Sequence, residues 1–202
     1  MKNKKILALA PHADDVEIAM GGTIAKLSKQ NDVTIITSII PSENHLGKKN
    51  QYMVENRLKE QEKSAKILGA KLKVLNFSQY EFKFSRKYIQ IFDTIVNKSD
   101  PDIIFCCWEH DTHQDHKTLA QITYSVLRKN DIALYSYEAM LPGGLNANTF
   151  NPQLFVDISN HIKVKIKALE QFKSVFKNKK NTYSNYFDSI IARAKYRGGT
   201  IG

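Results

Sequence analysis

Two short stretches of the chain carry most of the side chains that could do chemistry. Residues 11–17 read PHADDVE, and residues 109–116 read EHDTHQDH and hold three of the six histidines. Imidazole nitrogens and carboxylate oxygens are good zinc ligands, and a catalytic zinc site uses three of them and keeps one position for water. A carboxylate outside the ligand set can accept a proton from the water that attacks the substrate. The two stretches together therefore predict metal-assisted hydrolysis.

The spacing within the first stretch suits a metal site. His12 and Asp15 are three residues apart, so both can reach one ion from a turn that enters a helix, and one histidine of the second stretch would complete the set. Asp14 is then a candidate general base. Taken singly, each residue has an ordinary alternative, since lone histidines are often structural and Asp-Asp often caps a helix. Two histidines and one carboxylate also suit iron(II).

The hydrophobic pattern indicates which elements would position these stretches. Short apolar runs predict strands and alternate with amphipathic segments that predict helices. The predicted strands are 5–10, 33–38, 72–76, 103–107, 132–136 and 154–158, and the predicted helices lie near 20–30, 53–68, 86–98, 115–129 and 160–176. This alternation predicts an α/β fold, a single-domain Rossmann-like three-layer sandwich with a mostly parallel sheet, over residues 1–202.

Both reactive stretches directly follow predicted strands, the first and the fourth. Ligands of open α/β sheets bind beyond the carboxyl ends of the strands, where the strand order reverses. We therefore expect these strands to be neighbours and both stretches to face one crevice. A G-x-G-x-x-G pattern is absent, which disfavours a nicotinamide-binding enzyme.

The pair of motifs resembles a known family. PHADDVE followed by Gly21-Gly22, together with DTHQDHK at 111–117, is similar to the hallmark segments of the LmbE/PIG-L superfamily of zinc-dependent N-deacetylases, which act on amino sugars. Arg57 and Glu60 match its R-x-x-E helix, and the likeness covers essentially the whole chain.

The chain also departs from the family pattern. Ala13 replaces the usual proline, which removes no ligand. Phe172 and Val175 stand where many members carry polar side chains, which predicts a more apolar substrate-facing wall.

The resemblance implies a role for each candidate residue. Zinc would be held by His12, Asp15 and His116, and Asp14 would be the general base. His113 would stabilise the oxyanion or protonate the leaving amine, with its ring oriented by Asp115.

Three further residues have supporting roles in this interpretation. Asp111 and Glu17 would orient ligand imidazoles or brace backbone amides. Arg57 is a candidate for gripping substrate oxygens, and its alternative is a helix-surface ion pair with Glu60.

The basic character of the chain lies mostly in its C-terminal segment. Of the net charge of +10, residues 161–202 contribute +8, with lysines that include Lys177, Lys179 and Lys180. A solvated helix face is the simpler interpretation, and attraction of a phosphate on a nucleotide- or lipid-linked sugar is the sharper one. Aromatic residues in this segment suit base stacking, but the spacing of Phe172 and Phe176 favours a core stripe.

Composition places limits on the class of protein. With 202 residues, 42% hydrophobic and 25% charged, the chain can bury a core, and it contains no apolar run long enough to span a membrane. The N-terminus lacks a small-residue cleavage site, which disfavours a signal peptide. The two cysteines, Cys106 and Cys107, are adjacent and cannot form a disulfide framework, so we expect a reducing, cytoplasmic location.

The sequence thus predicts a zinc hydrolase that removes an N-acetyl group from an amino sugar or sugar conjugate. The alternatives are a deacylase acting on another N-acylated conjugate and a non-catalytic module that binds anions or nucleic acid. The complete set of acid/base and ligand candidates disfavours a nucleic-acid partner, and the resemblance allows for a homo-oligomer.

Overall fold

A computed structural model describes residues 1–42, 51–128, 131–139, 148–176 and 186–202. Its centre is a five-stranded sheet in the order β3-β2-β1-β4-β5, and every strand pair is parallel. The strands are β1 (Lys5–His12), β2 (Asp32–Ile39), β3 (Lys71–Val74), β4 (Ile103–Cys107) and β5 (Ala133–Tyr137). The strand order reverses between β1 and β4, which are neighbours as predicted.

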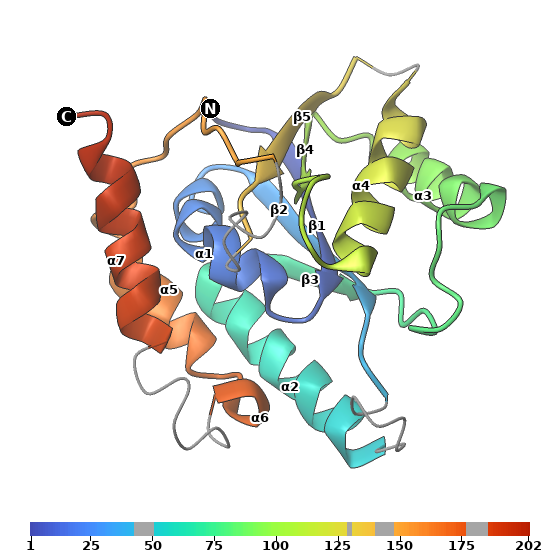
Figure 1. Ribbon diagram of the computed structural model, residues 1–202, viewed down its shortest axis with the longest axis horizontal. Coiled ribbons are helices and arrows are strands. Elements are labelled where there is room, and N and C mark those ends of the chain that lie inside the picture. Colours follow the sequence, from blue (N-terminus) through green and yellow to red (C-terminus); the bar gives the residue numbers. More distant parts are fainter. Residues whose placement is uncertain (43–50, 129–130, 140–147, 177–185) are drawn as a thin grey trace.

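Helices cover both faces of the sheet (Figure 1). On one face lie α1 (Asp15–Leu27), α2 (Gln51–Leu68), α5 (Ile162–Leu169), the short α6 (Lys173–Phe176) and α7 (Tyr186–Gly199); on the other lie α3 (Arg86–Ser99) and α4 (Gln114–Leu127). The predicted three-layer α/β sandwich is confirmed. The strands β1, β2 and β4 are buried almost throughout because helices exclude water from both faces of the sheet, and β1 and β4 are also mostly apolar.

The predicted sixth strand is wrong. Residues 154–158 form no strand but cross over α1, where a Cβ on Gly22 would lie only 2.8 Å from Ile158 Cδ1. Packing on a glycine of α1 thus replaces hydrogen bonding to the sheet. In this run the contact with α1 is made by Ile158, whereas Leu154 is exposed.

Three helix predictions also differ from the structure. The first helix begins at Asp15, earlier than expected, with a kink at Met20. The predicted helix at 160–176 is split into α5 and α6, and the carboxylate of Glu60 accepts hydrogen bonds from Ser174 N (2.8 Å) and Ser174 Oγ (2.5 Å) at the start of α6. The last helix, α7, was not predicted.

A second, smaller core cluster joins the C-terminal helices to the start of α1. Phe172 is fully buried there with Ala13, and the ring of Phe176 packs on Tyr186 and Phe187 at 5.0 and 5.2 Å. The core-stripe interpretation of Phe172 and Phe176 is therefore correct. The expectation that Phe172 lines a substrate-facing wall is wrong, because its side chain is enclosed by other apolar groups.

Within the described residues, no helix combines the length and apolar character needed to cross a membrane. Lys177, Lys179 and Lys180 lie outside the described residues.

Candidate metal and catalytic site

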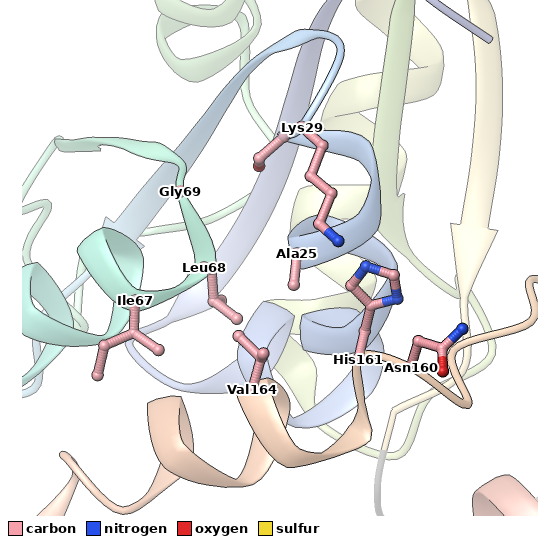
Figure 2. A pocket seen from close by; sticks show the side chains of 9 residues that line it. Ala25, Lys29, Ile67, Leu68, Gly69, Asn160, His161 and Val164 are labelled. Carbon is pink, nitrogen blue, oxygen red and sulfur yellow. The ribbon is translucent and has the colours of Figure 1, made fainter.

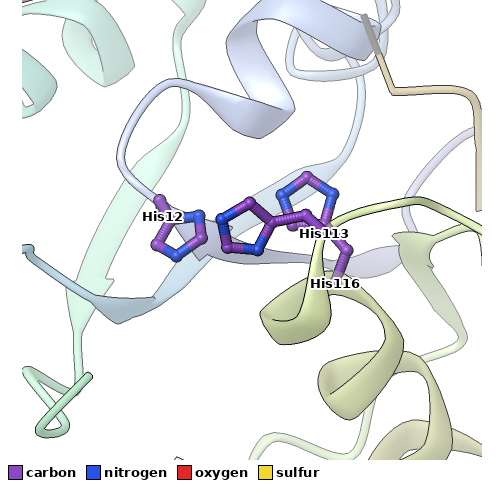
Figure 3. Close-up of side chains that lie close together, drawn as sticks. All are labelled: His12, His113 and His116. Carbon is purple, nitrogen blue, oxygen red and sulfur yellow. The ribbon is translucent and has the colours of Figure 1, made fainter. Parts of the chain in front are cut away.

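The end of β1 and the start of α4 bring the two reactive stretches together. His12 is the last residue of β1, Asp15 is the first of α1, and His116 lies in the first turn of α4. One nitrogen from each of His12, His113 and His116 lies within 4.8 Å of the others, and Figure 3 shows the three rings side by side. The prediction that both reactive stretches meet at the carboxyl ends of the first and fourth strands is therefore confirmed.

His12 and His116 each contact a carboxylate at both ring nitrogens, and Asp15 is shared by the two rings. His12 Nε2 lies 2.8 Å from Asp115 Oδ2, and His116 Nδ1 lies 2.9 Å from Asp111 Oδ2. If His12 donates its ring proton to Asp115 and His116 donates its ring proton to Asp111, the other nitrogen of each ring carries a lone pair. These nitrogens are His12 Nδ1 and His116 Nε2, and each lies 3.3 Å from Asp15 Oδ2. Metal-binding histidines typically have a carboxylate on the other ring nitrogen, so these residues fit a divalent cation such as zinc.

The electrostatics of the cluster also favour a cation. Burial lowers the pKa of His12 and of His116, but hydrogen bonds and charges from Asp115, Asp15 and Asp111 outweigh it and raise these pKa values to about 9 and about 10. Although burial opposes ionisation, the two imidazoles hold the pKa of Asp15 far below its usual range. The negative charges of the buried or half-buried carboxylates of Asp15, Asp111 and Asp115 are stabilised by positive charge, which a divalent metal would supply.

His113 differs from its two neighbours in its hydrogen bonding. The backbone N–H of Asp115 donates to His113 Nδ1 at 3.1 Å, so a neutral ring carries its proton on Nε2. Burial, then His12 and His116, lowers the pKa of His113, which favours the neutral ring. His113 belongs to the group of three histidines, and in this tautomer its Nε2–H can donate a hydrogen bond.

Asp115 contacts His113 through its backbone and His12 through its carboxylate. Its carboxylate lies 3.9 Å from His113 Nδ1 and instead contacts His12 at 2.8 Å. The backbone of Asp115, not its side chain, orients His113. The side chain orients a candidate ligand, as that of Asp111 does.

Asp14 lies beside the cluster in a conformation that few residues adopt. Its φ is 100°, at the N-cap of α1, and its Oδ2 accepts a hydrogen bond from Arg57 at 3.2 Å. Burial and the charge of Asp15 raise the pKa of Asp14 to about 7, while Arg57 opposes this rise. A carboxylate with a pKa near neutrality suits a general base. Arg57 therefore pairs with Asp14 and not with Glu60, whose carboxylate binds Ser174.

Glu17 lies in the first turn of α1 and is hydrogen-bonded to Gln61 of α2. Its side chain is fully buried, and Gln61 Nε2 donates to Glu17 Oε1 at 3.4 Å and to Thr37 Oγ1 at 2.7 Å. Burial raises the pKa of Glu17 to about 8. Gln61 was missed by the sequence analysis, although it lies four residues after Arg57, on the same face of α2.

The sequence is similar to those of known proteins. Residues 7–127 match the family model described as PIG-L, GlcNAc-PI de-N-acetylase. The diacetylchitobiose deacetylase of Thermococcus kodakarensis is 26% identical over 191 residues, which covers 86% of this chain and 70% of that protein.

Solved structures share the fold at lower identity. The N,N'-diacetylchitobiose deacetylase of Pyrococcus horikoshii, crystallised with an inhibitor, has a TM-score of 0.80 at 24% identity and covers 98% of this chain and 80% of its own. A 4-carboxy-2-hydroxymuconate hydratase from Pseudomonas putida has a TM-score of 0.79 at 16% identity, with 98% and 87% covered. Because a hydratase and a deacetylase share this fold, the fold alone does not decide the reaction.

The family model spans more than half of the chain and includes both reactive stretches. The chain therefore belongs to the PIG-L (LmbE-like) family of deacetylases.

Proposed function

We propose that this protein is a zinc-dependent hydrolase that removes the N-acetyl group from an amino sugar or a sugar conjugate and releases acetate and a free amine. The observation that carries the proposal is the pair His12 and His116, each with one ring nitrogen bonded to its own carboxylate and the other directed at Asp15. The acetyl-sugar substrate is supported by family membership and by the diacetylchitobiose deacetylase relative.

In this proposal His12, Asp15 and His116 hold the metal. Bound zinc supplies a Lewis acid that polarises the amide carbonyl and lowers the pKa of water. Asp14 accepts the proton of the attacking water, because its raised pKa leaves it basic enough near neutrality. The carboxylate of Asp14 is held in position by Arg57.

His113 acts on the other side of the reaction. Its Nε2–H donates a hydrogen bond to the carbonyl oxygen as negative charge develops there, and the proton that Asp14 took from the attacking water passes to the nitrogen of the leaving amine. The backbone N–H of Asp115 keeps this tautomer by occupying Nδ1. Asp14 thus moves the proton, and His113 stabilises the oxyanion.

The experiment combines metal analysis with acetate release. Purified protein is loaded with zinc, and acetate is measured with N-acetylglucosamine, its 1-phosphate and N,N'-diacetylchitobiose as substrates. His116→Ala should lose the metal, whereas Asp14→Asn should keep the metal and lose about 10²–10⁴-fold in rate.

Two variants serve as matched controls. His110→Ala removes a histidine of the same loop outside the three-histidine group, and Asp188→Asn removes an exposed carboxylate of α7. Both should keep full metal content and rate. Failure of the wild type to retain zinc or iron would refute the metal site, and retained metal with no acetate release would refute the substrate class and favour another N-acylated conjugate.

We also propose a cytoplasmic location. Cys106 and Cys107 are buried and free, which is the usual state of cysteines in a reducing compartment. Expression with a cysteine-alkylation readout in intact cells tests this, since oxidised thiols would contradict it.

A further inference from the structure

A cavity lies at the end of α1 remote from the three histidines. It has a volume of about 260 Å³ and lies between the last turns of α1 and α2 and the start of α5. It is lined by Ala25, Ser28, Lys29, Ile67, Leu68, Gly69, Asn160, His161 and Val164. The candidate catalytic residues lie at the first turn of α1 and the cavity at its last, so the length of the helix, about 20 Å, separates them.

Two polar side chains in this cavity have no hydrogen-bond partner. His161, the N-cap residue of α5, is only 8% exposed, and both of its ring nitrogens are buried and unpaired. The hydroxyl of Ser28 is buried and unpaired as well. Unsatisfied buried polar groups are rare in folded proteins because they cost free energy, and a ligand with complementary groups would remove that cost.

Gly69 brings the end of α2 close to Ser28 at the edge of the cavity. Gly69 has a φ of +75°, and a Cβ there would lie 3.3 Å from Ser28 Cβ. A side chain at this position would press on Ser28 at the edge of the cavity. Glycine therefore lets the end of α2 pass close to Ser28.

The charge around the unpaired groups is positive. Figure 2 shows Lys29 extending from the end of α1 toward the ring of His161. Burial, followed by the charges of Lys29 and Lys26, lowers the pKa of His161, while Asp157 opposes this. Asp157 is itself occupied by Ser159, whose N–H and hydroxyl donate to it at 2.9 and 2.6 Å. The lowered pKa favours the neutral imidazole, which has one donor and one acceptor, and the lysine ammonium supplies the charge.

The other residues that line the cavity indicate which class of anion it would bind. Ala25, Ile67, Leu68 and Val164 present an apolar surface. The helices α1 and α2 both end here, so their last carbonyl groups add partial negative charge, whereas only α5 points its N-terminus at the cavity. A compact, doubly charged phosphate would face these carbonyls and apolar walls. A singly charged carboxylate on a short hydrocarbon chain matches both parts of the surface.

We propose that this cavity is a second binding site, separate from the catalytic edge, for a small aliphatic carboxylate. The carboxylate meets the Lys29 ammonium and the unpaired groups of Ser28 and His161, and the hydrocarbon chain lies against Val164 and Ile67.

The test follows the imidazole of His161 by nuclear magnetic resonance in the zinc-loaded protein. The signal is assigned by through-bond correlation to its own backbone and checked by its loss in His161→Phe. Butyrate is the probe, and inorganic phosphate is the comparison. Because the readout belongs to one residue, butyrate that binds at the catalytic edge does not interfere.

We expect a saturable shift with butyrate at millimolar concentrations, and about tenfold weaker binding in Lys29→Gln and in Ser28→Ala. Lys98→Gln, an exposed lysine of α3 on the other face of the sheet, is the control and should bind as the wild type does. No saturable shift would mean that water alone fills the cavity and would overturn the proposal. A shift with phosphate but not butyrate would overturn the ligand class, and a shift unaffected by Lys29→Gln would overturn the site.

Discussion

Burial of the Lys165 amine lowers the stability of the folded protein, and a mutation can remove this loss. It belongs to the basic C-terminal segment, yet its side chain is buried against α1, with Cγ 3.2 Å from where a Cβ on Gly21 would lie. Its ammonium group has one hydrogen bond, to Ala19 O at 3.3 Å. Burial, and secondarily the charge of Arg193, lowers the pKa of Lys165 from 10.5 to about 7. We predict that Lys165→Met stabilises the protein.

The size and sign of the effect follow from this pKa. Between pH 7 and pH 10.5 the unfolded chain binds a proton at this lysine that the folded chain does not, so the free energy of unfolding rises with pH by up to about 1.4 kcal/mol per unit. At pH 7 the buried amine therefore costs about 4 kcal/mol. Methionine removes this cost and loses one hydrogen bond of about 1 kcal/mol, so the expected net gain is about 3 kcal/mol.

The assay is urea unfolding of wild type and Lys165→Met at pH 7, 8 and 9. The difference in unfolding free energy between the two proteins should shrink by about 2 kcal/mol across this range, because the wild type gains stability as its lysine loses the cost. Lys163→Met, an exposed lysine on the same helix, is the control and should give a constant difference. Parallel pH profiles for wild type and Lys165→Met would refute the reasoning.

Three further predictions concern the site and the packing. Asp111→Asn should weaken zinc binding about 10–100-fold in a chelator competition, because the carboxylate that orients His116 loses its charge; unchanged affinity would contradict that role. Gly22→Ala should destabilise the protein by about 1–3 kcal/mol in urea unfolding, because its Cβ would lie 2.8 Å from Ile158, and Ile158→Ala should relieve the strain. Phe172→Ala should cost about 3–5 kcal/mol by the same measurement, and a loss below 1 kcal/mol would place Phe172 outside the core.

The arrangement of the sheet was predictable because its signals are local. Uninterrupted apolar runs such as Ile103–Cys107 are typical of strands buried on both faces, and their alternation with amphipathic segments predicts parallel strands. The ends of the first and fourth predicted strands meet at the switch point of such a sheet, so the proximity of His12 and His116 followed from topology.

Two predictions were wrong for the same reason: an apolar run in the sequence does not show which part of the protein it packs against. Residues 154–158 read as a strand but lie on α1, where Gly22 leaves room for Ile158. Phe172 was expected at a substrate-facing wall and lies in a cluster with Ala13. Both outcomes depend on contacts between segments far apart in the chain, which periodicity cannot show.

Sequence alone determined the residue types of the site, their placement at one edge of a parallel sheet and the family likeness, since each depends on local spacing. Only the tertiary structure decided which groups bond to one another. The carboxylate of Asp115 bonds to His12, and its backbone N–H bonds to His113. Arg57 bonds to Asp14 and not to Glu60. These assignments depend on distances of about 3 Å between groups on different elements, and such hydrogen bonds form only where the fold brings a donor and an acceptor together.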